Sequence, residues 1–348
     1  MKAVLMPGAR QIDLVHREVP APGAGHVLIE MKAAGLCGSD LHMQFQPPPQ
    51  QRRGTFYGLQ MNPDIVPGHE PAGVVAEVGA GVDWLKPGDR VAVHHMAGCG
   101  HCLHCRRGWD INCTNRWGIY GLNVDGALQD YMVARAADCV RVPDEISMAE
   151  ACYYSCGAGT GYLALRRADF GLGDTVAVVG LGPVGLAAGF FAARSGAVVV
   201  GYDTNPDRMA FAAQFGFTAT INPLDGDDDT LATITRGRGA DVVVEATGKT
   251  AGRQSALDAA AAHGRVVCVG FSDELSELRI QSSILQKQVD VRGSWMFPVH
   301  ELERMLQSVA IQGVSITELI TAEYSLTNSQ QAWDAFDQGS LGKSVITW

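Results

Sequence analysis

The stretch Thr175-Val-Ala-Val-Val-Gly180-Leu-Gly182-Pro-Val-Gly185 decides the fold of the second half of the chain. Its first five residues predict a buried strand, and a helix is expected over Val184–Arg194. In this context the first glycine makes a tight turn, the second lets the backbone approach a pyrophosphate, and the third lets helix and strand pack closely. The helix N-terminus then favours the pyrophosphate charge. The residues predicted to bind a dinucleotide are therefore Gly180, Gly182, Pro183, Val184 and Gly185.

Strands and helices alternate beyond this motif. Val198–Tyr202 is predicted as a strand and Pro206–Phe215 as a helix, and two more buried strands are expected at Asp241–Val244 and Arg265–Val269. Such alternation is typical of a doubly wound parallel sheet with helices on both faces.

An acidic residue, Asp203, follows the strand Val198–Tyr202. A carboxylate there can accept hydrogen bonds from ribose hydroxyls and would repel a ribose 2′-phosphate, which favours NAD over NADP. Arg208 leaves three alternatives open: it stacks on adenine, bonds the ribose, or faces solvent at a helix start.

The N-terminal part reads as β-rich. Short alternating runs at His26–Ala33, Gly73–Gly79 and Asp89–His94 predict strands, and Pro-Gly pairs separate them. The spacing Ser147-Met-Ala-Glu150 predicts a capping box where the helical part begins. The tail carries two helical runs and a last strand, and it most simply returns to the first domain: His300–Gln312, Asn328–Phe336 and Lys343–Ile346.

The segment Met43–Val66 lacks a clear period and includes Pro47-Pro48-Pro49. It starts after His42 and ends just before Gly68-His69-Glu70, so two interpretations stay open. It is either a surface insertion or a flap over a site, because loops of this length are commonly one or the other.

Four cysteines follow the spacing Cys-x2-Cys-x2-Cys-x7-Cys. Three thiolates at intervals of three and a fourth from a nearby loop can close a tetrahedron around one zinc ion. Because four protein ligands saturate the ion, the predicted role is structural. The ligands are Cys99, Cys102, Cys105 and Cys113.

A second group of reactive side chains lies in Gly35–His42, which contains Cys37, Ser39, Asp40 and His42. A thiolate beside a hydroxyl and an imidazole suits a metal-bound alcohol and a route for its proton. A catalytic zinc needs three protein ligands and an open position. The candidate ligands are Cys37, His69 and Cys156.

Composition limits the classes of protein. At 348 residues, 47 % of them apolar, the chain can form two folded domains. A net charge of −10 disfavours nucleic-acid binding. We see no apolar run of the ~18 residues needed to span a membrane and no signal peptide, so we expect a cytoplasmic protein. Its nine cysteines are then reduced, and the remaining three are expected to be buried: Cys139, Cys152 and Cys268.

These motifs together make the chain resemble the zinc-dependent medium-chain alcohol and polyol dehydrogenases, over essentially its whole length. The resemblance implies a GroES-like catalytic domain over residues 1–150 and 298–348, with a structural zinc lobe at about 95–115. It implies a Rossmann cofactor domain over 151–297 and an active site in the cleft between the two.

The resemblance also implies roles for single residues. Cys37, His69 and Cys156 would hold the catalytic zinc, giving two zinc ions per chain. Ser39 would take the alcohol proton and His42 would pass it to solvent. On the same basis Thr160 would pack on the nicotinamide and the backbone at Val269-Gly270 would meet that ring.

Two carboxylates, those of Asp40 and Glu70, each have two possible roles. Asp40 either orients the His69 imidazole or caps a turn. Glu70 either stands behind the zinc or serves as an alternative ligand, and the presence of Cys156 favours the first arrangement.

We therefore expect hydride transfer between an alcohol and NAD. His95 lies at a position where the family commonly places a pocket side chain. Together with His94 and the long insertion, it suggests a more polar or bulkier alcohol than ethanol: a polyol, a sugar-derived alcohol or a functionalised secondary alcohol. The alternatives are a zinc-free quinone or enoyl reductase and a non-enzymatic NAD-binding protein. We expect the protein to act on a small-molecule substrate and to bind neither nucleic acid nor a membrane. We also expect a homo-oligomer, a tetramer rather than a dimer.

Overall fold

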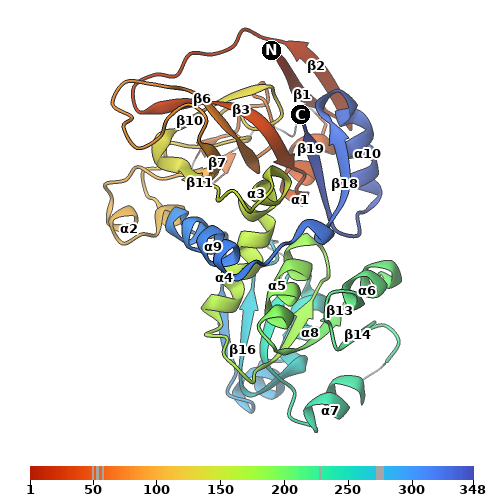
Figure 1. The fold of residues 1–348 in the computed structure, drawn as a ribbon. Helices are drawn as coiled ribbons and strands as arrows, with labels where there is room; N and C mark the ends of the chain where they lie inside the picture. Colours follow the sequence, from red (N-terminus) through yellow and green to blue (C-terminus); the bar gives the residue numbers. More distant parts are fainter. Residues whose placement is uncertain (49–50, 52–54, 57–58, 227–228, 272–277) are drawn as a thin grey trace. The chain divides into compact units, whose positions relative to one another are not determined.

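A computed structural model describes residues 1–48, 51, 55–56, 59–226, 229–271 and 278–348 (Figure 1). These residues form two compact units, one of Met1–Cys156 with Phe297–Trp348 and one of Gly157–Met296. The expected boundary after residue 150 falls inside helix α3 (Met148–Tyr154). Because α3 packs against strands of the first unit, that unit continues to Cys156.

The first unit is built on a seven-stranded sheet in the order β11-β7-β6-β3-β19-β18, with β10 also paired to β3. All pairs are antiparallel except β18–β19. The last two strands come from the C-terminal segment, and β18 was not predicted. The bounds are β3 (His26–Gly35), β6 (Pro71–Val78), β7 (Arg90–Val93), β10 (Tyr131–Arg135), β11 (Cys139–Arg141), β18 (Ile320–Ser325) and β19 (Lys343–Thr347).

A hairpin of β1 (Lys2–Gly8) and β2 (Gln11–His16) completes the N-terminal part. Its two turn residues, Ala9 and Arg10, have φ of 54° and 62°, the left-handed conformation of a tight hairpin turn. Helix α10 (Ser329–Gln338) packs beside it, with the buried Trp333 stacked 5.8 Å from the ring of Phe45.

Several short elements connect these strands. The residues after Cys37 form one α-helical turn, α1 (Gly38–Asp40), and a π-helix, η1 (Leu41–Phe45). The insertion at 43–66 is described only in part, since residues 49–50, 52–54 and 57–58 lie outside the described residues, and the flap interpretation stays a prediction. The others are β4 (Thr55–Phe56), β5 (Leu59–Gln60), β8 (Met96–Ala97), α2 (Leu103–Arg106), η3 (Asp110–Asn112), β9 (Gly118–Ile119), η4 (Ala136–Asp138), η6 (Thr317–Leu319) and η7 (Leu326–Asn328).

The second unit contains the predicted parallel sheet. Its six strands run in the order β14-β13-β12-β15-β16-β17, and every pair is parallel. The predicted strand at 175–179 is the inner strand β12. The bounds are β12 (Thr175–Val179), β13 (Val198–Tyr202), β14 (Ala219–Ile221), β15 (Ala240–Glu245), β16 (Ala260–Cys268) and β17 (Asp290–Gly293).

Helices connect these strands in two directions from β12. The path through α5 and α6 builds toward β14, and the path through α8 builds toward β17. Right-handed crossovers then place the two sets of helices on opposite faces, as the sequence predicted. The helices are α4 (Gly157–Arg167), α5 (Pro183–Arg194), α6 (Pro206–Ala213), α7 (Asp229–Thr235), α8 (Thr250–Ala259) and the π-helix η5 (Gln281–Leu285).

The capping box at the start of α3 is confirmed. Ser147 accepts a hydrogen bond from the Glu150 amide, and Glu150 accepts from the Ser147 amide and hydroxyl. The other oxygen of Glu150 accepts from the hydroxyl of Ser315 (2.7 Å) and the amide of Ile316 (2.8 Å), beyond the end of α9 (Val299–Gln312). Burial alone would raise the pKa of Glu150, but these hydrogen bonds outweigh it and hold the pKa below its ordinary value.

Because the pKa of Glu150 is lower in the folded chain, its carboxylate stabilises the fold above the unfolded pKa, and this contribution is lost as pH falls through the folded pKa. We expect Glu150→Gln to lower the free energy of unfolding by about 1–3 kcal/mol at pH 7, and the difference should shrink below about pH 4. Urea denaturation at both pH values measures this. Glu145→Gln, at an exposed position, should change stability by less than about 0.5 kcal/mol; equal effects of the two variants would contradict the assignment.

Candidate metal centres and nucleotide loop

The four predicted structural ligands are brought together in one lobe. The sulfur of Cys102 lies 3.5 Å from that of Cys105 and 3.9 Å from that of Cys113, and Cys99 lies 4.0 Å from Cys105. A tetrahedron with Zn–S bonds of about 2.3 Å has sulfur pairs about 3.8 Å apart, whereas a disulfide needs about 2.05 Å. The spacing of the sulfurs therefore fits one tetrahedral zinc ion and no disulfide.

Backbone amides of the lobe point at these sulfurs. The amides of Cys102 and Asn115 donate to the sulfurs of Cys99 and Cys113, each at 3.3 Å. Backbone hydrogen bonds, first of all that involving Cys105, lower the pKa of Cys102 to about 5. Burial instead raises the pKa of Cys105 to about 12 and also raises that of Cys113, so the protein alone stabilises the thiolate at only part of the lobe, and a bound cation would favour it at all four sulfurs.

A second group unites Cys37, His69, Glu70 and Cys156, whose ligand atoms all lie within 4.8 Å of one another. The sulfur of Cys156 is 3.5 Å from Nε2 of His69. This separation matches the roughly 3.6 Å that tetrahedral Zn–S and Zn–N bonds would give. The donors come from three distant places in the first unit: the end of β3, the turn before β6 and the residues after α3.

Both sides of the His69 ring are defined. Its Nδ1 lies 2.9 Å from Oδ1 of the fully buried Asp40, so Nε2 is left for a metal ion. Gln44 donates to the same Asp40 oxygen (3.3 Å) and to the backbone oxygen of Gly121 (2.5 Å). Of the two roles left open for Asp40, this contact supports the orienting one.

Glu70 forms a buried ion pair with Lys343, the first residue of β19. Lys343 is 1 % exposed and also donates to the backbone oxygen of Leu36 at 2.7 Å, while its ammonium lies 5.4 Å from the centre of the Tyr153 ring. A Cβ at Gly35 would meet Oε2 of Glu70 at 1.9 Å, so only glycine leaves room for this pair. Among the described residues, Oε1 of Glu70 has no hydrogen-bond partner, which leaves it available to a cation.

The charges of this group are coupled. A hydrogen bond with Cys156, and then the charge of His69, hold the pKa of Cys37 well below its ordinary value despite burial, and the same hydrogen bond raises the pKa of Cys156. Burial would lower the pKa of His69, but Asp40 and Cys37 outweigh it and raise that pKa. Burial raises the pKa of Glu70 to about 7 although Lys343 opposes the shift. A buried thiolate and carboxylate on one spot need a compensating cation.

Of the two residues of the expected proton route, Ser39 lies beside this group and His42 lies on η1. The hydroxyl of Ser39 is 4.0 Å from the Cys37 sulfur. His42 is exposed on η1, and its Nδ1 lies 2.9 Å from Oε1 of Gln46.

The two neighbouring histidines differ. His94 is fully buried with Nε2 2.6 Å from the backbone oxygen of Phe297, so its ring is held by the protein. The His95 ring meets the His69 ring edge-on at 4.6 Å, and its Nδ1 has no hydrogen-bond partner among the described residues. Nδ1 of His94 also lacks a hydrogen-bond partner among the described residues and lies 3.5 Å from Oδ2 of Asp110, so what distinguishes His95 is the contact of its ring with the ring of His69.

The glycine motif has the geometry that its sequence predicts. Gly180 has φ of 94°, and a Cβ at Gly185 would lie 1.9 Å from the Gly180 oxygen. Gly182 caps α5, followed by Pro183 at the first helical position. A Cβ at Gly182 would meet no described atom within 4 Å, so the space at the helix N-terminus is open to a ligand. The residues fit a dinucleotide.

Asp203 closes this loop from β13. One carboxylate oxygen accepts from the amide of Leu181 (2.7 Å) and the other from the amide of Asn205 (2.9 Å). Each oxygen keeps a lone pair for a ribose hydroxyl. Arg208 is half-buried in the first turn of α6, so its side chain does not simply face solvent.

The remaining predicted cofactor residues lie on other elements of the second unit. Thr160 is buried in α4 and donates to the Met296 sulfur at 3.7 Å. Val269 and Gly270 follow β16, and both amides donate to the backbone oxygen of Glu245. Their contacts with a nicotinamide stay a prediction.

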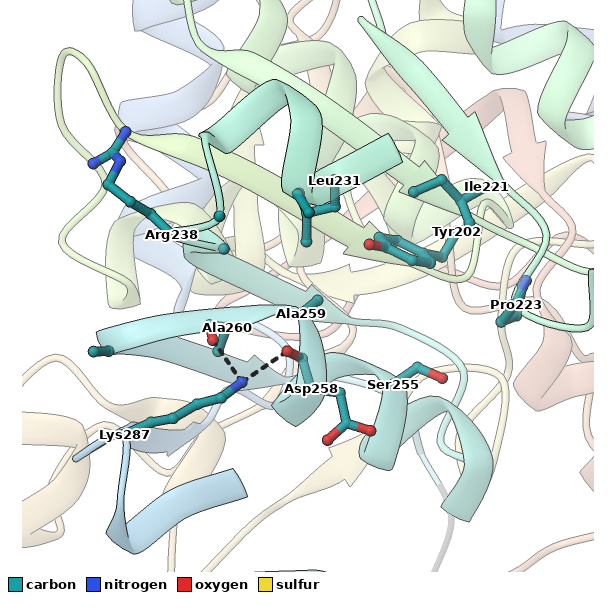
Figure 2. A pocket seen from close by; sticks show the side chains of 14 residues that line it. Tyr202, Ile221, Pro223, Leu231, Arg238, Ser255, Asp258, Ala259, Ala260 and Lys287 are labelled. Atoms are coloured by element: carbon teal, nitrogen blue, oxygen red, sulfur yellow. Dashed lines mark hydrogen bonds between the residues drawn. The ribbon is translucent and has the colours of Figure 1, made fainter. Parts of the chain in front are cut away.

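A cavity of about 640 Å³ lies on the sheet face beside α7 and α8 (Figure 2). Lys287 at its rim donates to the backbone oxygens of Asp258 (2.8 Å) and Ala260 (2.9 Å). The ammonium group of this lysine is therefore bound by backbone oxygens. None of the residues predicted to bind the nucleotide lines the cavity, so the cavity is separate from the glycine loop.

Two family models match the chain: "Alcohol dehydrogenase GroES-like domain" over residues 23–144 and "Zinc-binding dehydrogenase" over residues 183–310. The uncharacterized zinc-type alcohol dehydrogenase-like protein YphC of Escherichia coli K12 is 35 % identical over 100 % of this chain and 99 % of its own. The chain belongs to the zinc-type, medium-chain alcohol dehydrogenase family. The predicted resemblance and the GroES-like and Rossmann fold classes are confirmed.

Other known proteins are similar to this chain over nearly their whole length. The sorbitol dehydrogenase of Bacillus subtilis 168 is 32 % identical over 96 % of this chain and 93 % of its own. An alcohol dehydrogenase of Escherichia coli CFT073, solved with NADH, has a TM-score of 0.85 and 27 % identity, covering 100 % of this chain and 99 % of its own.

Two contacts in these sites were not predicted from the sequence. Lys343 lies 273 residues from Glu70 in the sequence. Gln44 contacts Asp40 because the helical segment formed by α1 and η1 places these residues, four positions apart, side by side. A lysine at the start of a strand and a glutamine in a loop carry no local signal of such roles. The expectation that the other three cysteines are buried holds for Cys152, whereas Cys139 and Cys268 are half-buried. Among the residues that the structure describes, no helix combines the length and the hydropathy needed to span a membrane.

The buried ion pair gives a prediction about stability. Lys343→Met leaves the Glu70 carboxylate buried without its cation and should lower the free energy of unfolding by about 3–5 kcal/mol. Glu70→Gln in the same chain should restore much of this loss. Urea denaturation measures both.

The surface pair of Lys32 and Glu30, 2.6 Å apart and more than one-third exposed on both sides, provides the control. Lys32→Met should cost about 0–1 kcal/mol. A Lys343→Met variant as stable as Lys32→Met, or a double variant no better than the single one, would contradict the role of the buried pair.

Proposed function

We propose that the protein is a zinc-dependent oxidoreductase that transfers hydride between an alcohol and NAD. The observation that carries this proposal is the convergence of Cys37, His69 and Cys156, with Glu70, within 4.8 Å. Two thiols and an imidazole are the ligands of a catalytic zinc site with an open position. A zinc-free reductase or a structural NAD-binding protein has no need of this group in addition to the four-cysteine lobe.

Cys37, His69 and Cys156 are the proposed zinc ligands, and Glu70 is an alternative ligand. Zinc bound there supplies a Lewis acid that lowers the pKa of a hydroxyl, and NAD supplies the hydride acceptor. Lys343 engages one Glu70 oxygen, so Glu70 reaches the ion only through the other. Cys99, Cys102, Cys105 and Cys113 are proposed to hold a second, structural zinc ion.

The chain's own residues then handle orientation and the proton. Asp40 holds the His69 ring through Nδ1. Ser39, close to Cys37, accepts the proton of the substrate hydroxyl, and His42 passes it to solvent from its exposed position.

NAD is proposed in preference to NADP. The Asp203 carboxylate at the glycine loop accepts hydrogen bonds from ribose hydroxyls and repels a 2′-phosphate. The structural relative solved with NADH supports the choice. The other proposed cofactor contacts are those of Arg208, Thr160, Val269 and Gly270.

The proposed substrate is a polyol, a sugar-derived alcohol or a functionalised secondary alcohol. The free Nδ1 of the buried His95 beside His69 offers a hydrogen bond to a second substrate hydroxyl, since a buried polar atom without a partner is costly. The similar sorbitol dehydrogenase supports a polyol.

Assembly as a homo-oligomer, a tetramer rather than a dimer, and a cytoplasmic location remain proposals. Nine cysteines without a disulfide suit a reducing compartment.

A panel of alcohols, assayed with NAD and NADP in parallel, tests the function. We expect polyols and secondary alcohols to be oxidised with NAD faster than simple primary alcohols. Cys37→Ala should abolish turnover and remove one of two zinc ions per chain, measured by elemental analysis.

Cys139→Ala is the matched control, because this half-buried cysteine lies outside both metal groups. It should keep both zinc ions and turnover. Full activity of Cys37→Ala, or the absence of turnover of every alcohol by the zinc-loaded protein, would overturn the proposed function; preference for simple primary alcohols would overturn the substrate class.

A further inference from the structure

The His42 ring belongs to a chain of hydrogen bonds that continues away from the metal ligands. Its Nδ1 lies 2.9 Å from Oε1 of Gln46, one turn later at the end of η1. The side-chain amide of Gln46 continues to Oδ1 of Asp337 on α10, at 2.5 Å. The other oxygen of Asp337 accepts from Nε of Arg10 at 2.6 Å.

The direction of each hydrogen bond follows from the carboxylate. Asp337 is ionised, because hydrogen bonds from Arg10 first, and then from Gln46, hold its pKa below the ordinary value. An ionised carboxylate only accepts, so the amide group that faces it must be the NH2 of Gln46. The amide oxygen then faces His42 and can only accept.

A histidine nitrogen that faces an obligate acceptor must carry a proton. We infer that Gln46, oriented by Asp337 and Arg10, fixes neutral His42 with its proton on Nδ1 and its free lone pair on Nε2. Gln46 and Asp337 are positioning residues for the proton route, and this use of His42 rests on the proposed function. With Nδ1–H retained against Gln46, Nε2 both accepts the proton and releases it to solvent, so the ring returns to the same tautomer after each turnover.

The groups that impose this direction are held firmly. The amide of Arg10 donates to the Phe45 oxygen at 2.7 Å, which ties the β1–β2 hairpin to η1. Gln330 of α10 accepts from the Ile12 amide (2.9 Å) and donates to the Arg10 oxygen (3.1 Å). The hairpin, η1 and α10 thus hold Arg10, Gln46 and Asp337 at fixed distances.

Magic-angle-spinning NMR of the zinc-loaded protein with ¹³C,¹⁵N-labelled histidine tests the inference directly. The ring ¹⁵N and ¹³C shifts report which nitrogen bears the proton, and subtraction of the His42→Gln spectrum identifies the His42 signals among ten histidines. At a pH where the ring is neutral, we expect the Nδ1–H form in the unaltered chain. Gln46→Met should shift the balance toward Nε2–H by about two- to tenfold, the range that one hydrogen bond supports.

Two further variants separate direction from packing. Gln46→Glu combined with Asp337→Asn keeps an oxygen acceptor for His42 and an amide donor between the two side chains, and it should keep Nδ1–H. Gln330→Met removes a glutamine that ties the same helix to the same hairpin but not to His42, so it should leave the tautomer unchanged. An Nε2–H form in the unaltered chain, or equal shifts in Gln46→Met and Gln330→Met, would overturn the inference.

The kinetic consequence is a separate measurement. In Gln46→Met, kcat for alcohol oxidation should fall about two- to tenfold with an unchanged KM for NAD, and the double variant Gln46→Glu with Asp337→Asn should recover it. A changed tautomer with an unchanged kcat would refute the positioning role. Because NMR requires no substrate, failure of the proposed function would show as absent turnover with the Nδ1–H form intact.

Discussion

The first unit depends on bringing two sulfurs, an imidazole and a carboxylate to one buried spot. Left without a cation, a thiolate and a carboxylate so close together would be costly in a low-dielectric interior. The surroundings are arranged accordingly: Asp40 holds His69, Lys343 balances Glu70, and Gly35 leaves the space that the pair needs. These contacts leave Nε2 of His69 and Oε1 of Glu70 without a hydrogen bond to Asp40 or Lys343, so both atoms could bind a metal ion together with the two sulfurs.

Local patterns in the sequence predicted the second unit well. The strand 175–179, the glycine turn and the alternation beyond it depend on neighbours in the chain, and all four strands predicted there are found in the parallel sheet of six. Gly185 shows why, since its missing side chain allows the close contact with Gly180 that the motif requires. The four-cysteine lobe was equally accessible, because its ligands lie within 15 residues. The two edge strands of the parallel sheet, β14 and β17, were not predicted.

Contacts between distant segments were harder to predict. Lys343 and Gln46 acquire their roles from partners hundreds of residues away, and neither residue type signals such a role in its own segment. Strand β18 was missed although its sequence, Ile-Thr-Ala-Glu-Tyr-Ser, alternates apolar and polar residues as a half-buried strand does. The predicted domain boundary after residue 150 was too early, because α3 packs on the sheet of the first unit. As a result, Cys156 belongs to the same unit as Cys37 and His69.

Zinc K-edge X-ray absorption on the purified, metal-loaded protein tests the central claim most directly. The account predicts two zinc ions per chain with first shells that average three sulfurs and one nitrogen or oxygen each, with Zn–S bonds of about 2.3 Å. That average arises from four sulfurs in the lobe of Cys99 to Cys113 and two, Cys37 and Cys156, at the second site. A single zinc ion surrounded by four sulfurs would contradict a metal centre at Cys37, His69 and Cys156.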